Sequence, residues 1–403
     1  MPWEETSPME QRKKLIEALR AGDLPMAEVC RRFGVSRKTG HKWWRRVMEL
    51  GEAGLDELSR APHCHPNAVT PEVEQLLLEL RKKRPTWGPR KLLASAERAY
   101  PRLVLPAPST LAALLRKQGL STSRRPRSRA TPSLDLVTSD FAAPNSVWCA
   151  DYKGHFFTGD GLRCNPLTIS DGFSRFLIRC EAVRRVDEVS ARPVFAHAFA
   201  EYGLPDAIRT DNGAPFASVA AAGLSRLAIW WTKLGIALQR IEPGKPTQNG
   251  RHERIHRTLK EDTASPPART HIAQQARFEQ FRHDYNQERP HEALANDVPA
   301  AHYKPSRRSY PGAEREPEYP TDWDVRRVRG DGSIKWRGET PFISEALCTE
   351  TIGIEELENG LHAVHFGPVR VGTLHPKRGF QRVLPEPRPG ASPKEAEPHR
   401  GAL

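Results

Sequence analysis

The sequence predicts a multi-domain protein with two α-helical units on the N-terminal side, an α/β core built on a mixed sheet, and a small C-terminal β-barrel. Apolar residues recur at helical spacing up to about residue 120, strand-like segments alternate with helices after residue 141, and five or six short strands follow residue 325. A chain of 403 residues is long enough for several domains of ~100–200 residues each. Its 36 prolines indicate linkers between them.

The formal charge of +13 is concentrated at one end of the chain. Residues 1–130 contain 26 Lys and Arg against 14 Asp and Glu, whereas residues 263–403 contain 20 of each kind. A basic excess confined to one region favours a polyanionic partner, and nucleic acid is the first candidate. No apolar run approaches the ~18 residues needed to span a bilayer, so we expect a cytoplasmic protein without a membrane partner.

The cysteines exclude two other classes of protein. All 6 are scattered, and no Cys-x-x-Cys pair occurs, which argues against a disulfide framework and against a zinc ribbon. Three consecutive residues, His63, Cys64 and His65, cannot readily converge on one metal ion. We therefore expect a proline-flanked loop at this position.

Residues 8–60 have the helix start, stop and turn signals of a helix-turn-helix domain. A first helix ends at Gly22, a second runs from Pro25 to Phe33, and Gly34-Val35-Ser36 provides a tight turn and a cap for a third. The last helix of such a motif enters the major groove of DNA. Its candidate DNA-binding side chains are Arg37, Lys38, Thr39, His41, Lys42, Arg45 and Arg46. The alternative is a helical hairpin with a solvated basic face, and the glycine turn favours the DNA reader.

Residues 66–120 predict a second helical unit, which we expect to be winged-helix-like and to bind DNA. Helices begin near Thr70, Thr86 and Ser109. A basic linker without apolar periodicity follows over residues 121–140 and can lie along phosphates. Its candidate DNA contacts are Arg124, Arg125, Arg127 and Arg129.

Residues 141–304 predict the α/β core, with a mixed five-stranded sheet and helices on its faces. The expected strands are 146–152, 164–170, 175–180, 207–210 and 238–241, and the expected helices are 187–202, 247–262 and 271–286. Residues 305–324 read as a linker rich in proline and charge. Residues 325–383 predict a small SH3-like β-barrel, and residues 384–403 predict a disordered tail.

Three acidic residues of the core are candidate functional residues because of their positions: two lie at strand ends and one lies on the long helix. Asp151 ends the first strand, Asp211 follows the fourth strand, and Glu253 lies on the helix. If they converge, their mutual repulsion requires a divalent cation, and oxygen ligands suit Mg²⁺ or Mn²⁺. Such a site can hold two ions that act on a phosphodiester. For the nearby Asp171 and Asp160, turns are the expected role.

The long helix around Glu253 is rich in cations. Arg257 and Lys260 follow at helical spacing and share the face of Glu253. Cations beside a metal-binding carboxylate suit a phosphate backbone, whereas the alternative is an exposed helix with Glu–Arg ion pairs. The candidate DNA-binding residues here are Lys245, Gln248, Asn249, Arg251, His256, Arg257 and Lys260.

Three sequence blocks, at residues 147–152, 209–216 and 244–254, together resemble the catalytic blocks of the DDE transposases with a retroviral-integrase-type core. The match is best with bacterial insertion-sequence transposases, and the resemblance covers about residues 8–380. It implies an RNase H-like fold for the core. It also implies that Asp151, Asp211 and Glu253 are the catalytic residues and bind two Mg²⁺ (or Mn²⁺) ions. The implied reaction is cleavage at transposon ends followed by strand transfer into target DNA.

The resemblance further implies double-stranded DNA partners: terminal inverted repeats, bound by the N-terminal domains, and target DNA. Two ends must be joined, so at least a homodimer is expected, in the bacterial cytoplasm at the nucleoid. The stretch between Asp211 and Glu253 is longer than in many relatives, and residues 217–234 are the expected place of the extra length. The His/Cys zinc module of retroviral integrases has no counterpart here, so zinc is not expected.

Two other functions remain open at this point. A domesticated transposase can act as a sequence-specific DNA-binding regulator, although a pure binder has no need for clustered carboxylates near DNA. An RNase H-like nuclease acting on RNA–DNA hybrids is disfavoured by the additional DNA-binding units. A chelator separates the regulator from the transposase, because a regulator's DNA binding survives EDTA.

Overall fold

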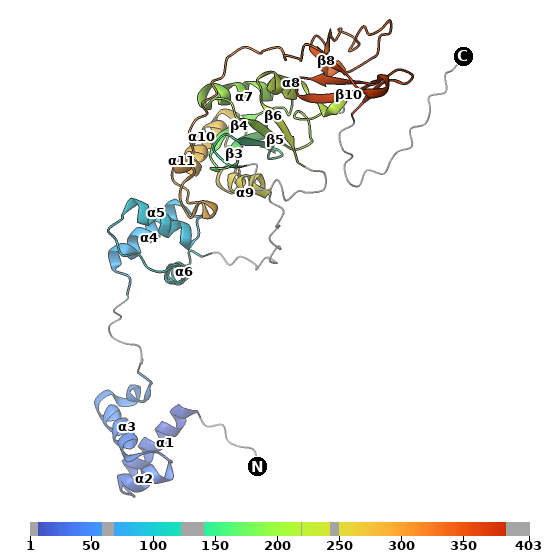
Figure 1. Cartoon of the computed structure of the whole chain (residues 1–403). Coiled ribbons are helices and arrows are strands. Elements are labelled where there is room, and N and C mark those ends of the chain that lie inside the picture. Colours follow the sequence, from blue (N-terminus) through green and yellow to red (C-terminus); the bar gives the residue numbers. More distant parts are fainter. Residues whose placement is uncertain (1–6, 59–67, 122–140, 219, 242–249, 384–403) are drawn as a thin grey trace. The chain divides into compact units, whose positions relative to one another are not determined.

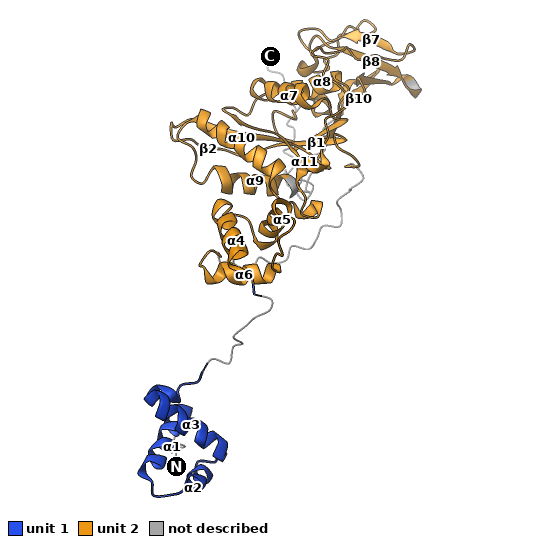
Figure 2. Ribbon diagram, turned by 90° about the vertical axis from the view of Figure 1, so that its left-hand side faces the viewer, with its two compact units in different colours: residues 1–68 blue, residues 69–403 orange. Residues whose placement is uncertain are grey.

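The computed structural model describes residues 7–58, 68–121, 141–218, 220–241 and 250–383. The chain divides into two compact units, Met1–Ala68 and Val69–Leu403 (Figures 1 and 2). Several predicted features lie outside the described residues: the loop at His63, Cys64 and His65, the linker arginines Arg124, Arg125, Arg127 and Arg129, and the tail 384–403.

The first unit is the predicted helix-turn-helix domain. Its helices are α1 (Pro8–Ala21), α2 (Met26–Arg32) and α3 (Arg37–Leu50), followed by the 3₁₀ turn Gly51–Leu55. The Ser36 side chain accepts a hydrogen bond from the Thr39 amide and so caps α3, and Gly34 takes a φ of 61° in the turn. The buried core consists of Leu15, Ile16, Val29, Trp43, Val47 and Leu55.

The predicted second helical unit is present as α4 (Pro71–Lys83), α5 (Pro89–Ala99) and α6 (Pro108–Lys117). Its core contains Leu77, Trp87, Leu92 and Leu111. No strand occurs among residues 68–121, so the expected wing is not part of this unit.

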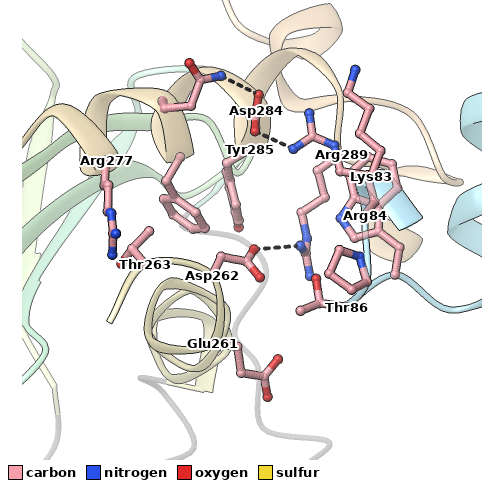
Figure 3. Close-up of a pocket in the computed structure, with 14 residues that line it drawn as sticks. Lys83, Arg84, Thr86, Glu261, Asp262, Thr263, Arg277, Asp284, Tyr285 and Arg289 are labelled. Atoms are coloured by element: carbon pink, nitrogen blue, oxygen red, sulfur yellow. Dashed lines mark hydrogen bonds and ion pairs between the residues drawn. The ribbon is translucent and has the colours of Figure 1, made fainter. Parts of the chain in front are cut away.

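Helices α4 and α5 are held against the core by charged side chains. Arg84 binds both Asp284 and Glu288, which lie at the end of α10 (His271–Gln287) and just beyond it. Figure 3 shows Arg84 beside Asp284, and the neighbouring Arg289 paired with Asp262. Arg98 donates to the Glu288 carbonyl at 3.0 Å. Cations on the helical unit therefore meet acids on the core, a pairing between distant parts of the sequence that no local pattern reveals.

The core sheet has the order β4–β3–β1–β5–β6, and the short β2 also pairs with β3. The strands are β1 (Val147–Tyr152), β2 (Phe156–Phe157), β3 (Arg163–Asp171), β4 (Leu177–Val183), β5 (Ala207–Thr210) and β6 (Ala237–Arg240). β3 runs antiparallel to β1 and β4, whereas β5 runs parallel to β1 and β6. This is the mixed sheet of an RNase H-like core, as predicted.

Helices cover both faces of the sheet (Figure 1). α7 (Glu188–Tyr202) and α8 (Arg226–Lys233) pack on one face around Trp148 and Ala150 of β1. α9 (Gly250–Thr263) and α10 pack on the other face, where Ile255 and Phe278 contact the buried Cys180 of β4. Successive residues of a strand face opposite sides, so alternate residues of β1 serve different layers. The predicted extra length at 217–234 contains α8, whose Trp230 and Trp231 belong to the core.

The C-terminal region is a five-stranded antiparallel sheet, and its closure into the predicted barrel stays a prediction. Its strands are β7 (Asp324–Arg327), β8 (Thr351–Glu356), β9 (His362–Phe366), β10 (Val369–His375) and β11 (Gly379–Arg382), paired in the order β11–β10–β9–β8–β7. No described pairing joins β11 to β7. The apolar side packs against Ala228 and Ile229 of α8 and against the irregular segment that contains Ile334.

Within the described parts of the chain, no helix is both long and apolar enough to cross a membrane.

Candidate active site

Asp151 lies near the end of β1, and Asp211 directly follows β5, the parallel neighbour of β1. β1 and β5 pair with the register Val147↔Ala207 to Cys149↔Arg209, and continuing the same register carries Asp151 to Asp211. Strands of a sheet lie about 4.8 Å apart, and paired residues of parallel strands face the same side. The side of Val147, Cys149 and Ala207 is opposite to that of Trp148. The two carboxylates therefore share the α9 face of the sheet.

The turn after β5 controls the direction of the Asp211 carboxylate. Its Oδ1 accepts a hydrogen bond from the Gly213 amide at 3.2 Å. Asn212 donates from Nδ2 to the Ile241 carbonyl at 3.0 Å, which ties the turn to the end of β6. A Cβ at Gly213 would lie 2.9 Å from Oδ2 of Asp211, closer than real Cβ contacts. Only glycine at position 213 therefore allows the Asp211 carboxylate to keep its present position.

Glu253 lies on the exposed side of α9. Its carboxylate makes no hydrogen bond or ion pair with any described residue, and the candidate phosphate contacts Arg257 and Lys260 are exposed on the same helix. The structure thus gives α9 a free acid and free cations together. The convergence of Glu253 with Asp151 and Asp211 stays a prediction, and Lys245, Gln248, Asn249 and the side chain of Arg251 lie outside the described part.

The buried side of α9 carries two histidines that contact the sheet. His256 places Nε2 2.8 Å from Oγ1 of Thr168 and Nδ1 3.8 Å from Oδ2 of Asp151. His252, one turn earlier, has Nε2 3.3 Å from Oγ of Ser170. Thr168 is the partner of Asp151 in the β1–β3 register, so α9 is anchored on the strand pair that carries the candidate catalytic residue.

Both imidazoles are neutral. Burial lowers the pKa of His252 to about 4, and burial together with the nearby His252 and Lys153 lowers the pKa of His256 to about 2. The contact of His256 with Asp151 is therefore not an ion pair. The Thr168 hydroxyl donates to the Asp151 carbonyl at 3.2 Å, so Nε2 of His256 donates to Thr168. Nδ1 then turns a lone pair toward the Asp151 carboxylate.

This arrangement of donors suits a cation. Ligand atoms of Asp151, His252 and His256 all lie within 4.8 Å of one another. A lone pair that faces a carboxylate is stabilised by positive charge between or beside them. Carboxylate oxygens such as those of Asp151 are the ligands that Mg²⁺ and Mn²⁺ prefer.

The histidine pair was missed in the sequence, where His256 was assigned to DNA contact. The structure corrects this assignment: His256 is 5% exposed and lies against β3 and β1. The signal was available, because His252, Ile255, His256 and Leu259 recur at i, i+3, i+4 and i+7 and form the buried stripe of α9. The cations on the other side of the helix favoured a DNA-binding interpretation of the whole helix.

Two other acids have the turn roles expected for them. The Asp171 carboxylate accepts hydrogen bonds from the amides of Asn145 and Ser174 and from the Ser174 hydroxyl. Asp160 accepts from the Leu162 and His271 amides. Both carboxylates are occupied in shaping loops.

The predicted DNA-reading helix α3 is largely exposed on its basic side. Arg37, Lys38, His41, Lys42 and Arg45 are exposed, and Thr39 is half-buried. Arg46 corrects the prediction: it is 8% exposed and donates to the Asp56 carbonyl at 2.6 Å, because it faces the helices rather than the surface. Its role is to hold the turn after α3.

Models of known protein families match most of the chain. An integrase core domain matches residues 142–246, and a second integrase core model matches residues 234–299. A helix-turn-helix domain matches residues 11–63, and a homeodomain-like domain matches residues 39–115.

Two curated relatives are proteins of bacterial insertion elements. The insertion element IS407 uncharacterized 31.7 kDa protein of Burkholderia multivorans is 29% identical over 219 residues, which are 54% of this chain and 76% of the relative. The insertion element IS476 uncharacterized 39.2 kDa protein of Xanthomonas euvesicatoria is 26% identical over 259 residues, 64% of this chain and 71% of the relative. Together with the family models, these relatives support a bacterial insertion-sequence transposase with an integrase-type core.

Solved integrase structures are also similar to this transposase. The HTLV-2 integrase catalytic core domain in complex with magnesium (trimeric form) matches with 17% identity and a TM-score of 0.32, over 40% of this chain and 98% of that one. The simian T-cell lymphotropic virus intasome in complex with PP2A regulatory subunit B56 gamma matches with 17% identity and a TM-score of 0.36, over 76% and 98%.

Proposed function

We propose that this transposase cuts DNA at the ends of its element and joins the freed 3′ ends to target DNA, with Asp151, Asp211 and Glu253 as its catalytic carboxylates. The observation that supports the proposal is the parallel pairing of β1 with β5, from Val147↔Ala207 to Cys149↔Arg209. Continued beyond the paired residues, this register would bring Asp151 and Asp211 to the same face of the sheet.

The residues present fit a divalent metal site of Mg²⁺ or Mn²⁺, two ions per active site. When bound, the ions would supply charge stabilisation to the attacking and leaving oxygens of the phosphodiester. Asp151 and Asp211 would hold them from the sheet and Glu253 from α9. His256 and Thr168 support Asp151 from the side, and the Gly213 amide orients Asp211. Arg257 and Lys260 would bind the phosphates of the substrate strand.

Within the same proposal, residues 8–60 and 66–120 bind the terminal inverted repeats, and residues 141–304 carry the catalysis. The exposed cations of α3 suit this role, because side chains of a recognition helix read base edges in the major groove. Two element ends must meet for joining, so the active form is at least a dimer that holds double-stranded DNA.

The test uses Asp151→Asn, Asp211→Asn and Glu253→Gln in the full chain, assayed on duplexes made from the DNA that flanks the gene. Each variant is expected to lose at least 10³-fold in Mg²⁺-dependent cleavage and strand transfer, on the order of what one essential catalytic group supplies. DNA binding in EDTA should persist. Glu261→Gln, on the same helix and exposed, is the matched control and should retain activity.

Full activity in any of the three variants removes that residue from the proposed metal site. Sequence-specific binding by the wild-type chain without any metal-dependent cleavage instead supports the regulator. Preferential cutting of an RNA–DNA hybrid supports the nuclease.

A further inference from the structure

A cavity of about 240 Å³ lies beside the candidate active site, between the helical unit and the core. Cys149 and Ser170, paired neighbours on β1 and β3, line one side, and Ile255 and Tyr285 line others. Lys91 of α5 closes it from the helical unit. We call it the α5–α9 pocket. Its wall comes from five separate segments of the chain, so no local sequence pattern predicts it.

The pocket is lined by an excess of positive charge. Its cations come from α5, from the β3–β4 turn, from α9 and from the segment after α10, and they are Lys91, Arg175, Arg254, Arg257 and Arg289. Only Arg289 has an ion-pair partner among the described residues, Asp262 at 3.6 Å. The other four side chains make no hydrogen bond or ion pair with the described part of the chain.

The acids in the wall do not balance these cations. Asp171 is occupied by the amides of Asn145 and Ser174 and by the Ser174 hydroxyl. Glu292 faces Arg90 at 3.5 Å. The pocket therefore keeps a net positive charge, which is an unfavourable arrangement for a protein in isolation.

The close approach of these cations is unfavourable, and the lowered pKa values of several of them reflect this. Burial, with the nearby Arg289, lowers the pKa of Lys91 to about 8. Burial also lowers the pKa of Arg175 and of Arg289. Cations held close together in a partly desolvated place are stabilised by an anion that brings the missing charge.

We infer that the α5–α9 pocket binds a backbone phosphate of the DNA strand that enters the active site. Guanidinium groups bind phosphate through two parallel hydrogen bonds, and three sides of the pocket offer such groups. The inference rests on the proposed function, since it requires that DNA reaches the α9 face of the sheet.

The position of the pocket fits a strand held for reaction. Cys149 lies two residues before Asp151 on the same face of β1, a separation of about 7 Å along a strand. Arg254 follows Glu253 directly on α9. A phosphate in the pocket thus places the adjoining nucleotides near both acids. Because Lys91 comes from α5, the helical unit contributes to the binding of the same strand that the core cuts.

Salt-dependent binding tests the inference on the full chain in EDTA, where no cleavage occurs. The variant is Lys91→Gln with Arg254→Gln, and the probes are a duplex from the flanking DNA and an unrelated duplex of equal length. Each lost phosphate contact should reduce the slope of log K against log salt by about 0.9. The double variant should bind both duplexes at least 10-fold more weakly at ~0.1 M salt, because phosphate contacts carry no sequence information.

Arg226→Gln is the matched control, because Arg226 is exposed on α8 at the opposite face of the sheet. It should leave the slope unchanged. The charge-conserving pair Lys91→Arg with Arg254→Lys should restore most of the binding. An unchanged slope in the double variant, or an equal loss in the control, overturns the inference. A loss confined to the flanking duplex assigns the pocket to end recognition rather than to a phosphate and also overturns it.

A footprint gives a second readout that is independent of affinity. Lys91, with its lowered pKa, should react readily with an acetylating reagent, and a saturating duplex should slow this reaction at least 5-fold. Unprotected Lys91 contradicts the inference even where Asp151→Asn abolishes cleavage and so upholds the proposed function. If the duplex protects Lys91 from acetylation but the wild-type chain never cuts DNA, the result has the opposite meaning. It supports phosphate binding in the pocket and contradicts the proposed function.

Discussion

The Nδ1 atom of His256 lies 3.8 Å from the Oδ2 atom of Asp151. A buried, neutral imidazole thus borders the candidate metal ligand, and the Thr168 hydroxyl bonds both the imidazole and the backbone carbonyl of Asp151. Nothing in this contact depends on ionisation of the histidine. Its effect is geometric: it limits where the carboxylate can point.

We expect His256→Gln to lower the cleavage rate about 10–100-fold and to raise the Mg²⁺ concentration needed for half-maximal activity, because Asp151 loses its lateral support. The variant should also lose about 1–3 kcal/mol of stability, since Thr168 loses a buried partner. Activity titrated with Mg²⁺ and thermal unfolding give the two readouts. His252→Gln is the control, equally buried but anchored on Ser170. A purely structural role for His256 predicts the same metal dependence in both variants.

Gly213→Ala should separate the geometry of Asp211 from the stability of the fold. The new methyl group would lie 2.9 Å from Oδ2 of Asp211, and the carboxylate is the part that can move. We expect an unchanged melting temperature and a loss of cleavage of at least 10-fold, because small displacements of a reacting group are costly. The control is Gly330→Ala, in open space in the C-terminal sheet region. Full activity with a shifted melting temperature would contradict this reading of the turn.

Gly40→Ala should destabilise the first unit alone. A Cβ at Gly40 would lie 2.4 Å from Sγ of Cys30, so α2 and α3 would have to separate. Overpacking of this kind costs about 1–3 kcal/mol. Calorimetry of the full chain should show a lower transition for the helix-turn-helix unit and an unchanged one for the rest. A uniform shift of all transitions speaks against independent units.

Arg45 and Arg46 are adjacent on α3, yet their substitutions should have different effects. Arg45 is exposed, so Arg45→Ala should weaken binding to the terminal repeat by about 1–3 kcal/mol and leave stability within about 0.5 kcal/mol. Arg46→Ala should lower stability through the lost contact with Asp56. Binding isotherms and unfolding curves measured on both variants test the contrast, which an exchange of the two phenotypes would refute.

The half-buried His291 makes the core sensitive to acid. Burial, with Arg289 and Lys91 nearby, lowers its pKa from 6.5 to about 3. Arg175 also faces it, and the Tyr285 carbonyl lies 3.4 Å from Nε2. Between these pH values the unfolded chain binds a proton that the folded chain does not. Stability therefore falls as the pH drops below about 6.5, by up to about 1.4 kcal/mol per pH unit from this group.

We expect His291→Gln to flatten the dependence of the melting temperature on pH between about 6.5 and 4. The comparison with the wild type isolates His291, since the neutral His252 contributes in the same direction to both chains. Parallel curves for the two proteins would show that His291 is protonated in the folded state.

Much of the fold was predictable because its signals are local. The glycine turn at Gly34 and the cap at Ser36 predict the helix-turn-helix. The strands of the core end within a few residues of their predicted bounds. Asp151 and Asp211 were found because a strand end is a local pattern. Their pairing depends on a parallel register that the sequence does not display, and it became visible only with β1 beside β5.

The errors have a common physical cause, the choice of packing partner. The apolar pattern after residue 325 predicts short strands, but it does not reveal that Ala228 and Ile229 of α8 pack against them. Arg46 and His256 have the composition of DNA contacts, yet both are buried by neighbouring elements. The α5–α9 pocket combines residues from Lys91 to Arg289, so no window of sequence contains it.

The alternation of β1 has an evolutionary consequence. Trp148 and Ala150 build the apolar layer under α7, while Cys149 and Asp151 line the opposite surface, so one short strand encodes both an interior and a reactive edge. A deletion of one residue within this segment exchanges the two sets, which places the acid among tryptophans and the indole beside the histidines. A one-residue deletion in this strand is therefore expected to disrupt the core packing and the reactive edge together. Substitutions within β1 keep its register, whereas an insertion or deletion of one residue does not.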